Sequence, residues 1–151
     1  MAGVIDTNIL LYAVNRDDER HDAAREFLYG AAQSSDLWYF TEGILYEFLR
    51  VTTHPRVFDR PLSWSQAMAF LRPFVDSDRF DIIAAGTGHW SELQDLLGTL
   101  THPSGNLFFD IRTAALMLEH GIRRIYTTDT DFLQFRRLEV VNPLSDLNSQ
   151  I

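Results

Sequence analysis

A short apolar run that stops at two acids constrains the fold of this chain more than any other feature. Residues 125–132 pass from an apolar pair through two threonines to Asp129 and Asp131. The apolar part is too short for a helix and predicts a buried parallel strand. Residues 3–8 repeat the pattern and place Asp6 directly after a second apolar run. Parallel strands present their carboxyl ends at one edge of a sheet, so these acids are expected to share a site there.

The rest of the chain alternates between strand patterns and helix patterns. The expected strands cover residues 3–6, 37–40, 80–83, a run from 125, and 138–141. The expected helices cover residues 9–13, 20–29, 41–52, 64–75, 89–100, and a stretch from 106 to a stop at Gly121. This alternation predicts an α/β fold with a mostly parallel central sheet and helices on both faces. The length predicts a single domain over residues 1–144, followed by a polar tail at 145–151.

Local signals predict where several of these helices begin and end. Gly30 is a stop signal for the second helix, while Thr41 and Ser63 are typical N-caps of the third and fourth. Trp90 is expected to face the core from the helix at 89–100. Asp110 is expected in the first turn of the helix that Asn106 opens.

The charge and composition exclude several classes of function. The net charge of −8 argues against a general nucleic-acid-binding protein, because phosphate contacts need positive charge. All 13 basic residues are arginine, which excludes a catalytic lysine, and the absence of cysteine excludes disulfides and thiolate metal sites. The sequence contains neither an apolar run of about 20 residues nor a basic leader, so we expect a cytoplasmic protein without a membrane span.

Four acids, with a fifth nearby, are the candidate site residues. Two carboxylates about 4 Å apart repel by roughly 4 kcal/mol at an effective dielectric constant near 20, so a cluster needs protons or cations. Oxygen ligands alone favour Mg²⁺ or Mn²⁺ over Zn²⁺. Such an ion polarises a phosphoryl oxygen and lowers the pKa of a bound water, which permits phosphodiester hydrolysis without a protein nucleophile. The candidates are Asp6, Glu47, Asp110 and Asp129, with Asp131 close by.

Simpler explanations exist for two of these acids and for the arginines. Asp6 alone is also a typical N-cap, and Glu47 alone could be a solvated residue beside an apolar helix face. Two bound divalent ions would change the formal charge from −8 to −4, and arginines near helix ends and loops could then bind phosphates. Any one of these arginines could equally be a solvated surface residue. The candidates are Arg50, Arg56, Arg60, Arg112, Arg123, Arg124, Arg136 and Arg137.

Taken together, the motifs resemble those of a PIN-domain ribonuclease. They lie at residues 4–8, 46–51, 106–110 and 128–132. More narrowly, the chain is similar to the VapC toxins of toxin–antitoxin pairs, with residues 48–58 and 141–144 as further matching segments. Each motif is weak alone, but the resemblance spans residues 3–144 with all four motifs in order.

The resemblance implies a three-layer α/β/α fold and an Mg²⁺- or Mn²⁺-dependent endoribonuclease that cuts structured RNA such as tRNA or rRNA. It makes Asp6, Glu47, Asp110 and Asp129 the catalytic, metal-binding acids. Asp131 is either a further ligand or a cap of the turn that follows. The resemblance also implies an antitoxin partner that covers the site, and a homodimer.

Several details of this resemblance concern single residues. Thr7 and Asn8 are expected to hold the Asp6 loop in shape, with Thr7 near the metal. Glu42 also precedes an apolar run, but Glu47 is the preferred second acid. Apolar helix surfaces are candidates for the partner contacts, although core packing explains most of their residues as well. They lie near Leu45, Leu49, Trp64 and Phe70.

Other protein classes fit less well. A haloacid-dehalogenase-type phosphotransferase has a second acid two residues after the first and a catalytic lysine, whereas this chain has Asn8 there and contains no lysine. A receiver domain fails because it needs the same lysine. A catalytically inactive PIN-like module that only binds RNA or protein remains the alternative, which the presence of all four acids disfavours.

Overall fold

The central layer of the protein is a five-stranded sheet in which every strand is parallel to its neighbours. The computed structural model describes residues 2–145. Within them the strands follow the order β3-β2-β1-β4-β5. The prediction of a mostly parallel sheet is therefore confirmed. The strands are β1 (Val4–Ile5), β2 (Trp38–Thr41), β3 (Phe80–Ile83), β4 (Arg124–Tyr126) and β5 (Glu139–Val141).

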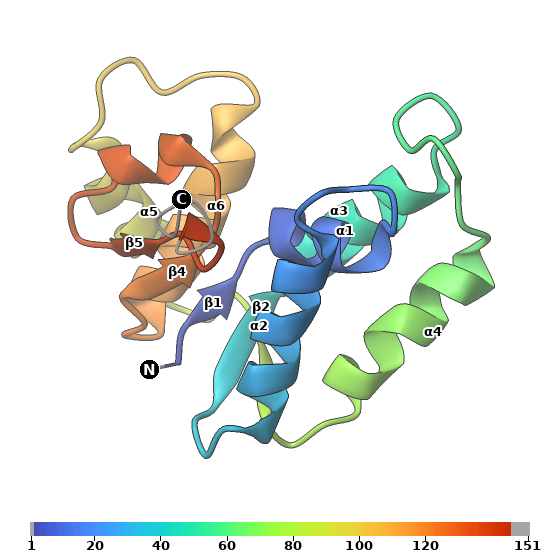
Figure 1. Cartoon of the computed structure of the whole chain (residues 1–151). Coiled ribbons are helices and arrows are strands. Elements are labelled where there is room, and N and C mark those ends of the chain that lie inside the picture. The colour runs from blue at the N-terminus through green and yellow to red at the C-terminus, as the bar shows by residue number, and fades with distance from the viewer. Residues whose placement is uncertain (1, 146–151) are drawn as a thin grey trace.

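Helices cover both faces of this sheet and complete three layers. In Figure 1, α2 lies in front of β2, whereas α5 and α6 lie together behind β4 and β5. The helices are α1 (Thr7–Val14), α2 (His21–Gln33), α3 (Glu42–Thr53), α4 (Trp64–Val75), α5 (His89–Leu97) and α6 (Leu107–Glu119), with a short 3₁₀ helix η1 (Thr130–Gln134). None of the helices within residues 2–145 is long and apolar enough to cross a lipid bilayer.

The two predicted N-caps are confirmed. The Thr41 hydroxyl accepts a hydrogen bond of 3.1 Å from the backbone N–H of Ile44 at the start of α3. Ser63 forms a reciprocal pair with Gln66, in which each side chain accepts from the other residue's backbone N–H. These bonds satisfy N–H groups that the first turn of a helix otherwise leaves without partners.

Two predicted helix ends are wrong. Gly30 does not end α2, which continues to Gln33. A glycine inside a helix costs only about 1 kcal/mol, and Leu28 and Ala31 on either side of it are buried in the core. Helix α5 ends at Leu97 instead of residue 100.

Trp90 is 75% exposed and does not face the core, contrary to the prediction. The buried residues of α5 are His89 and Leu96, which lie on one face of the helix. Asn106 does precede α6, although its side chain makes no cap hydrogen bond, and Asp110 lies in the first turn as predicted.

The core is continuous through the middle of the sheet. Val4 and Ile5 of β1 are fully buried, as expected for a central strand covered on both faces. Phe40 on β2 stacks on Phe80 of β3, and Phe74 of α4 packs edge-on against Phe80. The polar tail predicted at 145–151 lies outside the described residues except for Ser145.

Candidate functional site

The candidate site lies where the order of the sheet changes direction. Strands β1 and β4 are parallel neighbours, with Ile5 opposite Tyr126, although most of the chain separates them. The chain reaches β2 on one side of β1 and β4 on the other. At such a switch point the connections after the two strands diverge and leave a crevice at their carboxyl ends. Asp6 follows β1 directly, and Asp129 lies three residues after the end of β4.

Asp6 is held in this crevice by two hydrogen bonds. Its Oδ1 accepts from the backbone N–H of Thr7 at 2.8 Å, and its Oδ2 accepts from the Thr127 hydroxyl at 2.7 Å. The residue is only 9% exposed. Burial raises the pKa of Asp6 to about 6, although both hydrogen bonds act to lower it. Asp6 is therefore the N-cap of α1 and at the same time a buried site carboxylate.

Thr127 connects three parts of the site and is not among the residues predicted from the sequence. Its hydroxyl donates to Asp6 and accepts from the Asn8 side-chain amide at 3.1 Å and from the Asp129 backbone N–H at 3.0 Å. The proton and both lone pairs of the Thr127 hydroxyl therefore all take part in hydrogen bonds. The only signal in the sequence is a hydroxyl residue placed between the end of a strand and an acid.

Thr7 links the first acid motif to the second. Its hydroxyl lies 3.2 Å from Glu47 Oε2 and 3.3 Å from the backbone oxygen of Ile44. These contacts, and the bond from Asn8 to Thr127, are those expected of residues that hold the Asp6 loop in shape.

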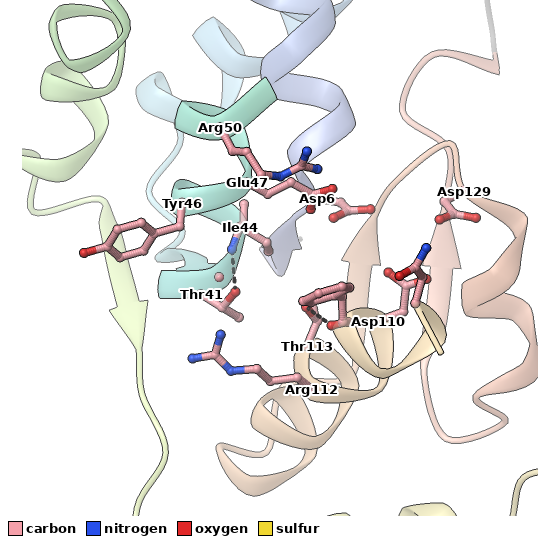
Figure 2. A pocket seen from close by; sticks show the side chains of 13 residues that line it. Asp6, Thr41, Ile44, Tyr46, Glu47, Arg50, Asp110, Arg112, Thr113 and Asp129 are labelled. Carbon is pink, nitrogen blue, oxygen red and sulfur yellow. Dashed lines mark hydrogen bonds between the residues drawn. The ribbon is translucent and has the colours of Figure 1, made fainter. Parts of the chain in front are cut away.

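All four predicted acids line one cavity of about 780 Å³ between α3 and α6. Figure 2 shows Glu47 and Asp6 close together, with Asp110 and Asp129 across the opening from Glu47. Glu47 lines the cavity and Glu42 does not, which supports Glu47 as the second acid. The cavity is lined by Asp6, Thr41, Gly43, Ile44, Tyr46, Glu47, Arg50, Asn106, Phe109, Asp110, Arg112, Thr113 and Asp129.

Three of the acids lie especially close to one another. One oxygen each of Asp110, Asp129 and Asp131 falls within 4.8 Å of the other two. The pKa of Asp110 is raised to about 7, first by burial and then by the charges of Asp129, Asp6, Asp131 and Glu47. The arrangement of acids thus favours a proton on Asp110, or a cation beside it, near neutral pH.

Asp129, and not Asp131, caps the turn that follows. Asp129 Oδ1 accepts from the backbone N–H of Asp131 at 2.9 Å and is the N-cap of η1. Of the two alternatives for Asp131, the structure does not show the cap. Its exposed carboxylate stands beside Asp110 and Asp129 at the rim of the cavity.

The donor set suits a hard divalent cation. Within residues 2–145, the close cluster consists only of carboxylates, with no histidine among them. Carboxylate oxygens are the ligands that Mg²⁺ and Mn²⁺ prefer. A bound cation would also relieve the repulsion that raises the pKa of Asp110.

The structure separates the eight candidate arginines into three groups. Arg50 and Arg112 line the cavity. Three others form ion pairs, namely Arg60 with Asp17, Arg124 with Glu139, and Arg137 with Glu92. The remaining three, Arg56, Arg123 and Arg136, are exposed and lie outside the lining of this cavity.

The four residues proposed for partner surfaces differ in exposure. Trp64 is 75% exposed at the start of α4. Leu45 is 8% exposed and belongs to the core. Leu49 and Phe70 are partly buried, and Phe70 stacks on the core residue Phe48.

Sequence comparisons match this chain to one family of proteins. The sequence model of the PIN domain matches residues 3–138. Ribonuclease VapC33 of Mycobacterium tuberculosis is 32% identical over 144 residues, which cover 93% of this chain and 97% of that protein. Ribonuclease VapC48 of the same organism is 28% identical over 96% of this chain and 99% of its own length.

Two solved structures share the fold. VapC20 of Mycobacterium tuberculosis, described as a toxin that cleaves the sarcin–ricin loop, superposes with a TM-score of 0.62 at 18% identity over 86% of this chain and 92% of that one. VapBC2 of Rickettsia felis was solved with a DNA fragment from its promoter. It superposes with a TM-score of 0.67 at 19% identity, over 93% of this chain and 98% of that one. The match over residues 3–138, the relative with 32% identity and the acids gathered at one edge of the sheet lead to one conclusion: this chain belongs to the PIN-domain family, among the VapC ribonucleases.

Proposed function

We propose that this protein is a divalent-metal-dependent endoribonuclease that hydrolyses phosphodiester bonds in structured RNA, and that it acts as the toxin of a toxin–antitoxin pair. The observation that carries the proposal is the gathering of Asp6, Glu47, Asp110 and Asp129 around one cavity. The named activity of the relatives supports the same assignment.

In this proposal the acids hold the metal and the neighbouring polar residues hold the acids. Asp6, Glu47, Asp110 and Asp129 are the catalytic ligands, and Asp131 is an additional ligand at the rim. When bound, a divalent ion supplies Lewis acidity that polarises a phosphoryl oxygen and lowers the pKa of a coordinated water. The cation must displace the proton that Asp110 retains near pH 7, so binding is expected to strengthen as the pH rises.

The cation that we propose is Mg²⁺ or Mn²⁺. Both accept ligand sets made only of oxygen, and both leave positions open for substrate phosphate oxygens. The close cluster contributes three carboxylates, which is enough to anchor an ion without enclosing it.

The proposed partners are an RNA substrate, a cognate antitoxin and a second copy of this chain. The Rickettsia felis structure contains a VapB–VapC pair, and the antitoxin is proposed here by analogy with it. Exposed Trp64 is the candidate contact for one of the two protein partners. A toxin that cuts structured RNA works where RNA and antitoxin meet, so we assign it to the cytoplasm.

RNA cleavage by the purified, antitoxin-free protein tests the proposal. The assay compares Mg²⁺, Mn²⁺ and EDTA, with tRNA and rRNA as substrates. The matched variant is Asp110→Asn, which keeps the shape of the side chain and removes its charge. Cleavage that requires the cation and is lost in the variant supports the metallonuclease.

A folded protein that cleaves neither RNA class with either cation would contradict the proposal. Cleavage that persists in EDTA, or in Asp110→Asn, would reject the metal mechanism while leaving ribonuclease activity in place.

A further inference from the structure

The cavity that holds the acids is much larger than a metal ion needs. A water molecule occupies about 30 Å³, so an ion with six waters takes roughly 200 Å³. The cavity measures about 780 Å³. The remaining volume extends between α3 and α6 to a part of the lining that contains no acids.

Arg112 and Tyr46 lie at this acid-free end. Figure 2 shows both side chains directed away from Asp129, with Arg112 extending past Thr41. On α6, Arg112 follows Asp110 by two residues, and positions two apart on a helix point in different directions. One helix therefore presents a carboxylate to the metal cluster and a guanidinium to the other end of the cavity.

The Arg112 guanidinium is not used by the fold. Among residues 2–145 its side chain makes neither an ion pair nor a hydrogen bond, whereas Arg60, Arg124 and Arg137 are paired with acids. The absence of a side chain at Gly43 leaves room for the Arg112 guanidinium. A Cβ added at Gly43 would come within 2.8 Å of Arg112 Nη1. Gly43 lies in α3, so its lack of a side chain keeps this space open.

Tyr46 adds an exposed aromatic ring to the lining of the same cavity. Its side chain is 67% exposed although the residue precedes Glu47 on the same helix. An exposed ring is a suitable platform for an unpaired base, and base stacking tolerates any sequence. A guanidinium and an aromatic ring that line one cavity can bind the phosphate and the base of a single-stranded nucleotide.

We infer that the cavity end formed by Arg112, Tyr46 and the space at Gly43 binds the nucleotide next to the scissile phosphate, with its phosphate on Arg112 and its unpaired base on Tyr46. The inference deepens the proposed ribonuclease function and rests on it. It assigns to Arg112 and Tyr46 the positioning of an unpaired nucleotide beside the cleavage position. A paired base cannot reach Tyr46 because its faces are covered by its neighbours in the helix.

Charge also favours RNA as the occupant. Four acids and two arginines line the cavity, so its formal charge is −2 when all are ionised, and one divalent cation neutralises it. A phosphate is then attracted by Arg112 without net repulsion from the acids. An acidic segment of a protein partner would offer a carboxylate to Arg112 but has no base to place on Tyr46.

The experiment measures binding of a fluorescein-labelled single-stranded oligoribonucleotide by fluorescence anisotropy. Ca²⁺ replaces Mg²⁺ and Mn²⁺ so that a divalent cation neutralises the acids, and gel electrophoresis checks that the probe stays intact. Arg112→Ala should weaken binding at least fivefold and reduce the slope of log K against log salt by about 0.7, the value for one phosphate contact on a single strand. Tyr46→Ala should weaken binding on the order of tenfold without changing this slope, and Tyr46→Phe should bind like the wild type.

Two further variants separate the inference from general effects of charge or stability. Arg123→Ala is the matched control, because Arg123 is exposed, lies just before β4 at the opposite end of the sheet, and should not change binding. Gly43→Ala should weaken binding by displacing Arg112 while raising the melting temperature, because alanine favours a helix over glycine. A fully paired duplex of the same sequence should bind more weakly than the single strand.

Equal losses in Arg112→Ala and Arg123→Ala would overturn the inference, as would wild-type affinity in Arg112→Ala and Tyr46→Ala. Binding of a labelled octaglutamate peptide in preference to RNA would overturn it in favour of a protein occupant. Altered RNA binding without any RNA cleavage in Mg²⁺ or Mn²⁺ would reject the proposed function and leave the subsite standing. RNA cleavage that neither Arg112→Ala nor Tyr46→Ala changes would reject the subsite and leave the proposed function standing.

Discussion

The Thr127 hydroxyl donates a hydrogen bond of 2.7 Å to Asp6 Oδ2, although 121 residues separate the two in the sequence. The bond joins the ends of β1 and β4, and Thr127 is 1% exposed. The same hydroxyl accepts from Asn8 and from the backbone of Asp129. A single side chain thus sets the relative positions of the first and the last acid motif.

Thr127→Val should destabilise the protein and reduce cleavage. The substitution keeps the shape of the side chain but leaves a buried carboxylate oxygen and two donors without a partner. We expect a loss of about 1–3 kcal/mol in the free energy of unfolding, measured by urea denaturation. Thr127→Ser keeps the hydroxyl and should restore most of the cleavage. Equal damage from valine and serine would show that the methyl group matters and the hydrogen bonds do not.

The metal-free protein should become more stable as the pH is lowered from 7.5 towards 5. The pKa of Asp6 is about 6 in the folded protein and near its ordinary value of 3.8 in the unfolded chain. The folded state therefore binds the proton more tightly than the unfolded chain. Ionisation of Asp6 lowers the free energy of unfolding by about 3 kcal/mol. This loss is complete above pH 6 and small near pH 4. Asp110, with a pKa of about 7, acts in the same direction at slightly higher pH.

Thermal unfolding in EDTA across this pH range checks the prediction. Asp6→Asn removes one of the two titrating groups and should flatten the profile. A melting temperature that falls steadily from pH 7.5 to 5 in the wild type would contradict it.

A divalent cation should stabilise the wild type, because it binds a carboxylate cluster that only the folded state forms. At a concentration about 100 times its Kd, the gain should be about 2.7 kcal/mol. Asp110→Asn should respond much less, since it removes one of the three clustered carboxylates. In EDTA near pH 8 this variant should be more stable than the wild type, because it no longer carries a half-buried charge among other acids. Calorimetry with and without Mg²⁺ distinguishes these outcomes.

Asp129 should matter more for cleavage than Asp131. Asp129 lines the cavity, whereas Asp131 is exposed at its rim. We expect Asp129→Asn to lower the cleavage rate by more than about a hundredfold and Asp131→Asn on the order of tenfold. Asparagine is also a good capping residue, so η1 should persist in Asp129→Asn, which circular dichroism can verify. The reverse ranking would place the principal metal ligand on Asp131.

Local patterns were enough to predict most of the fold. Each strand contains or adjoins a short apolar run, and such a run is visible without tertiary information. The caps at Thr41 and Ser63 were predictable because a cap is a contact within a single turn. The end of α2 was not, since burial of Leu28 and Ala31 outweighs the local cost of Gly30. The prediction that Trp90 faces the core failed for a similar reason. Helix α5 has apolar residues on more than one face, and its packing on α6 decides which face is buried.

The sequence by itself determined that parallel strands end in acids, because strand ends are encoded by neighbouring residues. Only the tertiary structure decided which side chains meet. The adjacency of β1 and β4 brings Asp6 to Thr127, and the rotation of α6 directs Asp110 to the cluster and Arg112 away from it. Likewise, ion pairs with distant acids occupy Arg60, Arg124 and Arg137, while Arg112 keeps its charge available in the cavity. These outcomes depend on strand order, helix rotation and contacts between residues far apart in the chain, which no local pattern contains.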